Sequence, residues 1–471
     1  MKENEASTRT LYRVLMDLGS KAKDKGIFRL QLLHFPIVVI FNPNYVQTIL
    51  SGGPSSSVMG SVYINKLSKW LKTGLGTSEG EKWKCRRRLL TPIFHSQNLI
   101  NDSLSSINQH SIQLCKKITR EPEQADLNET MASYTLSVIL DFAMGVTASS
   151  DMEQFLGYKQ AIREFGKFVI NSSLNPIYWY DFTLNFTSLG RSVRSTLQTL
   201  HSFSDKIINV RSVEWRRRHD NAVGNVDGSF EGKKSSAFLD FLFDQHFNMG
   251  AIDLSGIKEE VDAFTFAGYD TTSCAISFCL YNIARHEHVS SKLKEEIRMV
   301  FGGKVSDIDG RLVTEEDLCK LSYLDAVIRE SLRLYPPTPI MIRKLLKEMS
   351  FDDGLKLPAG TEVMIHIPLL HRDKLQFPNP EIFNPERFLL KNSLERHPYA
   401  YIPFSAGHRN CIAQRFAMIE LKVTIANILR KFNLSLPLGK ETVSLATDLT
   451  LVTVDPISVT FTLIKHFENT E

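Results

Sequence analysis

The chain has 471 residues, of which 43% are hydrophobic and 23% are charged, an ordinary balance for a globular protein. This composition excludes a collagen, an intrinsically disordered chain and a disulfide-rich miniprotein. The formal net charge is only +4, and so mild a basic excess does not indicate a nucleic-acid partner.

No stretch of the sequence is typical of a membrane span. The longest purely apolar run covers residues 37–41, whereas a spanning helix needs about 20 such residues. The amino-terminal residues MKENEASTRT also lack the apolar core of a secretory signal. We therefore expect a chain without an anchor helix of its own.

In chain order, residues 27–50 carry β-branched and alternating apolar runs, which predict short strands. Residues 219–235 are polar and contain glycine, which predicts a surface loop after the basic run 216–218 at a solvated helix end. Apolar side chains recur at spacings of three and four over residues 254–285, which predicts a long helix of about 48 Å.

Further elements follow toward the carboxyl end. We predict a helix over about 314–334, ended by prolines, then short strands within 338–368 and a helix from near Cys411 to about Phe432. The fold class predicted is mainly α with small β-sheets, and residues 1–471 are expected to form a single large domain.

One of the six cysteines, Cys411, has surroundings that favour a thiolate. None of the six forms a CxxC pair, so a zinc site is not indicated. Cys411 is predicted at the start of the helix, where backbone N–H groups and the positive end of the helix dipole would face its sulfur. Gly407 permits a sharp turn and Arg409 adds a cation, so the sulfur suits iron. The alternative is a plain buried cysteine.

The pattern Phe-x-x-Gly-x-Arg-x-Cys over residues 404–411 resembles the axial-ligand motif of the cytochrome P-450 haem-thiolate monooxygenases. The family motif continues to a glycine where this chain has Ala413, and His408 replaces a frequent proline. The resemblance implies the cytochrome P-450 fold and a haem b held by Cys411 as the axial thiolate. It also places Phe404 and Arg409 in the cofactor site.

A second set of residues is predicted to support that loop. Glu330 and Arg333 lie three apart on one predicted helix, so they can pair. The resemblance implies that Arg387, in Asn-Pro-Glu-Arg-Phe, completes a buried three-residue network.

Several cations and donors are candidates for the haem carboxylates. Trp83 and Arg87 lie four apart on one helical face, and an indole N–H and a guanidinium suit carboxylates. The alternative is an ordinary basic helix. The resemblance adds Arg343 and Arg409 as further partners of the haem edge.

A group of basic residues is expected to be exposed and to steer an acidic electron donor. The resemblance implies NADPH–cytochrome P-450 reductase as this donor, with cytochrome b5 as a further candidate. The residues are Lys82, Lys84, Arg86, Arg88 and Arg415.

The centre of the long helix, residues 267–272, reads Ala-Gly-Tyr-Asp-Thr-Thr. Gly268 permits close approach of a flat cofactor, and Thr271 can bond back to a carbonyl and open the helix locally. A hydroxyl and a carboxylate at such an opening can deliver protons to dioxygen. This segment matches the family pattern, which implies that Thr271 and Asp270 are the oxygen-activation pair.

Several stretches resemble family 4 of these enzymes, especially its insect members: residues 139–146, 175–191 and 259–272. Many family-4 enzymes carry a glutamate that forms an ester to the haem, and Ala267 stands in its place, so we expect non-covalent haem. The resemblance implies a lipophilic substrate: a fatty acid hydroxylated at its chain end, which the missing glutamate disfavours, an insect hormone, or a xenobiotic such as an insecticide.

The resemblance also implies a location on the cytosolic face of the endoplasmic reticulum membrane. Microsomal relatives begin with an anchor helix and a hinge, and this sequence opens roughly where the hinge would end. We therefore expect either a trimmed chain or a form that binds the membrane surface peripherally. An aromatic cluster is interpreted as a pocket lining, a membrane-facing entrance or plain core: Tyr178, Trp179, Tyr180, Phe182 and Phe186.

Three alternative functions differ from a monooxygenase in the residues that they require. A peroxide-rearranging haem-thiolate isomerase tends to lack the acid–alcohol pair that Asp270 and Thr271 provide. A catalytically silent haem-binding or sensor protein stays open because of Ala413 and His408. A cysteine hydrolase is disfavoured because no histidine–amide partner pattern accompanies Cys411.

Overall fold

Helices dominate the chain in the computed structural model, which describes residues 2–32, 35–53, 55–146, 152–224, 237–302, 311–389 and 395–464. The chain divides into two compact units. The sheet unit comprises Met1–Ser61, Ile107–Tyr134 and Asp270–Glu471, and the helical unit comprises Val62–Ser106 and Thr135–Tyr269. The predicted class, mainly α with small sheets, is confirmed.

The described part of the helical unit contains helices and no strand. Its core surrounds Trp70, which is fully buried and makes edge contacts to the rings of Tyr158, Phe165 and Phe266. The helices that lie wholly or partly in this unit are α3 (Ser61–Leu71), α4 (Gly80–His95), α5 (Gln97–Arg120), α6 (Leu127–Met144), α7 (Met152–Leu174), η2 (Pro176–Tyr178), α8 (Asp181–Asn185), α9 (Ser188–Gly224), α10 (Phe238–Phe247) and α11 (Leu254–Arg285).

Helix α9 continues where a loop was predicted. It runs to Gly224, so the prediction is wrong for residues 219–224, and residues 225–235 lie outside the described ranges. Within this helix the rings of Trp215 and His219 stack with their centroids 3.8 Å apart. The basic run lies inside α9, where Arg216 covers the ring of Phe247 and Arg218 bonds to Asp240.

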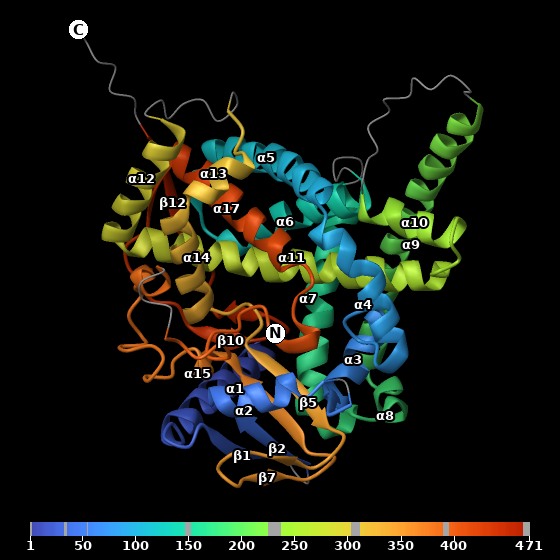
Figure 1. Ribbon diagram of the computed structural model, residues 1–471, viewed down its shortest axis with the longest axis vertical. Coiled ribbons are helices and arrows are strands. Elements are labelled where there is room, and N and C mark those ends of the chain that lie inside the picture. The colour runs from blue at the N-terminus through green and yellow to red at the C-terminus, as the bar shows by residue number, and fades with distance from the viewer. Residues whose placement is uncertain are drawn as a thin grey trace. The chain divides into compact units, whose positions relative to one another are not determined.

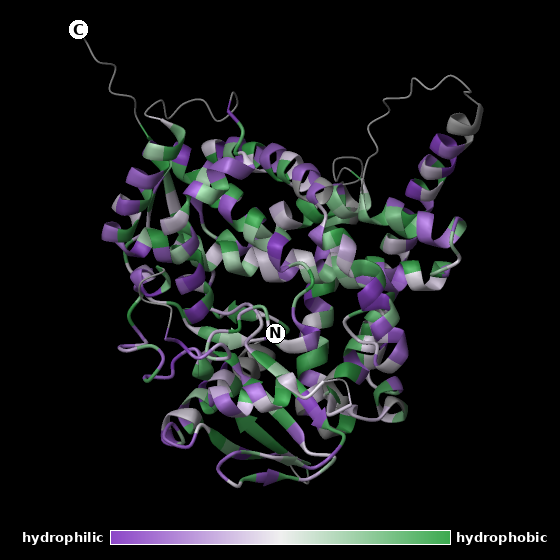
Figure 2. Cartoon of the chain, viewed as in Figure 1, coloured by the Kyte–Doolittle hydropathy of each residue, from purple (hydrophilic) through white to green (hydrophobic). Residues whose placement is uncertain are grey.

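The largest sheet belongs to the sheet unit and has the strand order β1-β2-β8-β5-β3. Only the β2–β8 pair is parallel. Figure 1 shows α1 (Lys2–Lys21) and α2 (Pro43–Ser51) beside this sheet, and Figure 2 shows that β1 and β2 are largely hydrophobic. The strands are β1 (Ile27–Leu32), β2 (Phe35–Ile40), β3 (Ser57–Met59), β5 (Ile340–Leu345) and β8 (Glu362–His366).

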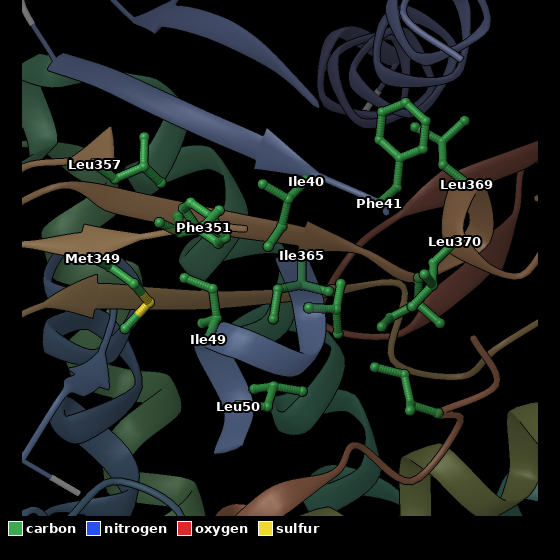
Figure 3. Close-up of a cluster of buried hydrophobic side chains, with 14 of the residues drawn as sticks. Ile40, Phe41, Ile49, Leu50, Met349, Phe351, Leu357, Ile365, Leu369 and Leu370 are labelled. Carbon is green, nitrogen blue, oxygen red and sulfur yellow. The ribbon is translucent and has the colours of Figure 1, made fainter. Parts of the chain in front are cut away.

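The prediction of strands over 27–50 is correct for β1 and β2 but wrong for α2. Asn42 accepts a hydrogen bond from the Asn44 N–H at 2.9 Å and caps the helix, and Pro43 occupies its first turn. The apolar residues of α2, including Ile49 and Leu50, pack against the sheet in one buried cluster (Figure 3). This cluster fixes α2 at the position where it meets the loop before Cys411.

The rest of the sheet unit is made of short strands and helices. The helix predicted over 314–334 is two helices, because the Glu296 carboxylate accepts the N–H groups of Tyr323 and Leu324 and so caps a second start after Leu321. The helices that lie wholly in the rest of the sheet unit are α12 (Glu287–Phe301), α13 (Glu315–Lys320), α14 (Ser322–Leu334), α15 (Ile367–Leu370), η3 (Pro385–Phe388), η4 (Gly407–Arg409) and α17 (Gln414–Lys431). Its other strands are β4 (Glu123–Gln124), β6 (Met349–Ser350), β7 (Lys356–Leu357), β9 (Phe432–Ser435), β10 (Leu445–Thr447), β11 (Leu451–Thr453) and β12 (Val459–Leu463).

Within the described ranges, none of the helices combines the length and the apolar character that a membrane span requires.

Candidate functional site

Cys411 lies on a loop that closes on itself. Its N–H donates to the Phe404 carbonyl at 2.9 Å, and the Asn410 N–H donates to the Gly407 carbonyl at 3.2 Å. The Cys411 side chain is exposed, whereas Phe404 and Arg409 are half-buried. Helix α17 begins at Gln414, three residues later than Cys411 and thus later than predicted. The loop itself, more than the first helical turn, therefore presents the sulfur.

Gly407 is required by the geometry of this loop. Its φ is +73°, and a Cβ at this position would lie 2.2 Å from the Leu50 carbonyl oxygen of α2. The predicted sharp turn at Gly407 is confirmed. Ala413 has a φ of −96°, which any residue adopts, so the loop does not demand glycine there.

The donor set around Cys411 fits a haem. No cluster of three His, Cys, Asp or Glu side chains that could hold a metal ion exists among the described residues. A single exposed thiol can hold iron firmly only if the metal arrives with its other ligands, as it does in a porphyrin. The Ser405 hydroxyl in the same loop is buried without a hydrogen-bond partner, and Ser405 has a φ of +61°. An unsatisfied buried hydroxyl in the loop that carries Cys411 is consistent with a cofactor neighbour.

The predicted supporting network is present and buried. Glu330 and Arg333 are both 0% exposed, and Arg333 donates to the Glu330 carboxylate from Nε at 2.7 Å and from Nη2 at 2.9 Å. Arg387 lies 3.4 Å from the same carboxylate, and burial lowers the pKa of Arg387. The Asn384 N–H donates to Glu330 at 2.8 Å. The three charged residues therefore form one network, as predicted.

Asp270 and Thr271 lie on α11 in the sheet unit, and both are half-buried. The Asp270 carboxylate accepts a hydrogen bond from the Thr450 hydroxyl at 2.8 Å. Sequence reasoning missed Thr450, because nothing in the spacing relates it to α11. The helix continues without interruption through Thr271, so the predicted local opening is absent from α11, all of which is described.

Gly268 lies in close contact with helix α6. A Cβ there would lie 2.8 Å from Cδ1 of Ile139 on α6, so the glycine permits helix–helix contact within the helical unit. The carbonyl of Tyr269 accepts a further bond from the Thr135 hydroxyl of α6 at 2.9 Å. These contacts hold α11 against α6, and the predicted approach of a cofactor at Gly268 stays a prediction.

The other predicted haem partners divide between the two units. Arg343 lies on β5 in the sheet unit and is buried, with Nη1 2.9 Å from the Met59 sulfur. Trp83 and Arg87 lie on α4 in the helical unit; Trp83 is buried and Arg87 is half-buried. Cys411, Phe404, Arg409 and Arg343 thus share a unit that does not include the α4 pair.

The predicted basic surface needs one correction. Arg86 is buried, because its guanidinium lies 3.8 Å from Glu260 and 3.9 Å from Asp253. The other members, Lys82, Lys84, Arg88 and Arg415, are exposed as predicted. Three of them lie near a carboxylate: Lys82 is 2.7 Å from Glu259, Lys84 is 2.5 Å from Glu81, and Arg415 is 3.5 Å from Glu315.

Three of the remaining cysteines are poor nucleophiles. Cys115, Cys274 and Cys279 are buried, and burial raises the pKa of the Cys274 and Cys279 thiols. Cys411 is instead exposed, in the setting that a metal-binding thiolate requires.

Comparison with known proteins agrees with this site. The family model for cytochrome P-450 matches residues 6–461. Cytochrome P-450 4V2 of Rattus norvegicus is 36% identical over 455 residues, which cover 96% of this chain and 84% of the rat protein. Human cytochrome P-450 4V2 is 35% identical, covering 90% of this chain and 80% of the human protein.

An insect relative, cytochrome P-450 4c3 of Drosophila melanogaster, is 35% identical and covers 93% of this chain and 82% of its own length. The predicted likeness to family 4, including its insect members, is confirmed. The match along nearly the whole chain, together with the cysteine loop, shows that this protein belongs to the cytochrome P-450 family of haem-thiolate monooxygenases.

Proposed function

We propose that the chain inserts one oxygen atom from dioxygen into a lipophilic substrate, with Cys411 as the thiolate ligand of a haem b. The observation that carries this proposal is the exposed thiol on a loop that only glycine at position 407 can form. When bound, the haem supplies the iron at which dioxygen is reduced and cleaved. The residues of the chain hold the haem, exclude water and deliver protons.

The proposed division of roles follows the location of each side chain. Arg343 and Arg409 of the sheet unit are proposed to hold haem carboxylates through charge-assisted hydrogen bonds. Trp83 and Arg87 of the helical unit stay predicted partners of the haem edge. Phe404 is proposed to line the cofactor site from within the ligand loop. Thr271 and Asp270 are the proposed proton-delivering pair, and the Thr450 hydroxyl orients the Asp270 carboxylate.

Turnover with a reductase tests this function. We propose that NADPH–cytochrome P-450 reductase supplies the electrons, assisted by cytochrome b5. A screen of fatty acids, insect hormones and insecticides for type-I spectral shifts identifies a ligand, and this ligand is then incubated with NADPH and reductase. Product that requires both components supports the proposal. A product formed from a peroxide without NADPH would favour an isomerase, and binding without product would favour a sensor.

The exposed face of α4 is the proposed docking site for the reductase, because an acidic donor is attracted to basic side chains. The variant Lys84→Glu/Arg88→Glu is expected to slow reductase-supported turnover, more strongly at low salt than at high salt. A control reversal at Lys320, exposed on α13, should leave the rate unchanged. An unchanged rate in the α4 variant would rule out this docking site.

The haem is proposed to be non-covalent, because the exposed Ala267 offers no carboxylate for an ester. Extraction with acidified organic solvent should remove all the haem from the polypeptide. Haem that stays with the protein would contradict this proposal.

We propose that the protein acts at the cytosolic face of the endoplasmic reticulum membrane. Tyr180, Phe182 and Phe186 are 66%, 74% and 73% exposed, so the interpretation of these three side chains as core is wrong. Exposed aromatic side chains of this kind suit the interfacial region of a bilayer. Replacement of Phe182 and Phe186 by serine is expected to weaken binding to phospholipid vesicles, and unchanged binding would exclude this contact.

A further inference from the structure

A buried histidine, His371, connects the supporting network to the segment before the cysteine loop. It is 0% exposed and follows α15 directly. The Ile402 N–H donates to its Nε2 at 2.9 Å, and its Nδ1 lies 3.3 Å from the Arg333 carbonyl. Because a backbone N–H can only donate, Nε2 must be unprotonated. The ring proton therefore resides on Nδ1, where the Arg333 carbonyl accepts it.

The imidazole is held in its neutral form. Burial, and then the nearby Arg333 charge, lowers the pKa of His371 to about 3. A protonated ring would carry a hydrogen on both nitrogens and would meet the Ile402 N–H donor against donor. The neutral ring thus keeps its acceptor at any pH at which the enzyme is expected to work.

The connection between His371 and Arg333 runs in both directions. Arg333 Nη1 donates to the His371 carbonyl at 3.0 Å, while the His371 ring donates to the Arg333 carbonyl. One residue earlier than Ile402, the Tyr401 hydroxyl donates to the Arg329 carbonyl at 2.9 Å. Two successive residues, 401 and 402, are therefore tied to α14, which also carries Glu330.

The same segment leads directly to the sulfur. The Ile402 carbonyl accepts the Ser405 N–H at 3.0 Å, and the Phe404 carbonyl accepts the Cys411 N–H at 2.9 Å. A continuous series of hydrogen bonds thus runs from Glu330 through Arg333, His371 and Ile402 to the loop that carries Cys411.

We propose that His371 is a positioning residue for the thiolate loop, which it holds through its bond to the Ile402 N–H so that the Cys411 sulfur stays directed at the iron. This proposal rests on Cys411 being the iron ligand, as proposed above. His371 transmits the rigidity of the buried charge network to the loop. Without this bond, the Ile402 N–H has no acceptor and the segment shifts.

Two conservative variants separate this role from general packing. In His371→Gln the amide oxygen reaches the place of Nε2 and retains the acceptor for Ile402, whereas the shorter amide of His371→Asn reaches only the place of Nδ1. The measurement is the ratio of thiolate-ligated to thiol-ligated carbonyl haem in the reduced protein, read from the two Soret bands. We expect the Asn variant to lower this ratio roughly tenfold, the effect of one unmade buried hydrogen bond, and the Gln variant to stay within about twofold of the wild type.

His366 provides a matched control in the same chain. It too is 0% exposed, and burial lowers its pKa to about 3. Its Nδ1 accepts the Leu369 N–H at 3.2 Å, and its Nε2 has no hydrogen-bond partner among the described residues. His366→Asn retains the useful acceptor, so the ratio should not change. An Asn variant of His371 with the wild-type ratio, or a Gln variant that loses as much as Asn, would overturn the proposal.

The wild-type protein offers a second test that requires no haem. Nuclear magnetic resonance of the protein with 15N-labelled histidine reports which ring nitrogen carries the proton. The His371 signal is assigned by its loss in the Gln variant or by selective labelling. Between pH 5 and 8 it should show a proton on Nδ1 and none on Nε2. A proton on Nε2 overturns the proposal. If the wild type lacks a thiolate band but shows this tautomer, the ligand assignment of Cys411 fails and the bond from His371 to the loop segment stands.

Discussion

Removal of the charge at Glu330 is expected to destabilise the protein more than any other single isosteric change in the network. The carboxylate is 0% exposed and accepts three hydrogen bonds, two from Arg333 and one from the Asn384 N–H. It also lies 3.4 Å from the Arg387 guanidinium. In Glu330→Gln the amide NH₂ meets an arginine N–H donor against donor, and both cations stay buried without an anion.

The loss can be estimated from this geometry. Breaking a buried ion pair by removing one partner costs about 3–5 kcal/mol, a large share of the roughly 5–15 kcal/mol that stabilises a typical protein. The matched control is Glu386→Gln in η3. The Glu386 carboxylate lies 2.6 Å from the Lys292 ammonium, but the side chains are 39% and 56% exposed. An exposed pair of this kind contributes about 0–1 kcal/mol.

Urea unfolding followed by far-ultraviolet circular dichroism measures both variants under identical conditions. The Glu330 variant should unfold at a clearly lower urea concentration with an unchanged slope, and the Glu386 variant should match the wild type. Equal midpoints for the two variants would refute the reasoning, because they would mean that burial of the network carries no energetic weight.

Three further predictions follow from single side chains. Burial raises the pKa of Glu260 to about 7 from an ordinary 4.5, so the folded state retains a proton that the unfolded chain releases. The free energy of unfolding should therefore fall by about 3 kcal/mol as the pH rises from 4.5 to 7. Urea titrations at several pH values should show this decrease, and Glu260→Gln should abolish it. Gly407→Ala should abolish haem binding in a hemin titration, because its new Cβ would meet the Leu50 carbonyl oxygen. The control Gly439→Ala should bind haem normally, because Gly439 has a similar positive φ but open space around it. Equal haem binding by the two variants would contradict a clash with Leu50. Thr271→Ala should consume NADPH without matching product, while Thr265→Ala on the same helix keeps the two coupled; full coupling in the Thr271 variant would exclude its proton-delivery role.

Local sequence patterns predicted those parts of the fold that depend on local chemistry. The long helix over 254–285 was predicted with the bounds that α11 has, because its apolar spacing and its length leave few alternatives. The loop over 404–411 and its glycine were also anticipated, since a positive φ at Gly407 follows from the turn itself. The pairing of Glu330 with Arg333 needed only helical spacing.

The errors occur where distant residues decide the structure. The helix over 314–334 is interrupted because a carboxylate from another helix, Glu296, caps its second half. Arg86 was expected on the surface, but it is buried next to Glu260, which is remote in sequence and lies 3.8 Å from its guanidinium. His371 was missed because the two hydrogen bonds of its ring join it to residues 38 and 31 positions away. No spacing rule within one sequence reports such contacts.

The measurement that tests the central claim most directly is the carbon monoxide difference spectrum of the reduced, haem-loaded protein and of Cys411→Ala. The account predicts the long-wavelength Soret band of thiolate ligation in the wild type and in Cys319→Ala, a control at another exposed cysteine of the same unit, and its complete loss in Cys411→Ala. A wild type without that band, or a Cys411→Ala protein that keeps it, would contradict the assignment of Cys411 as the iron ligand.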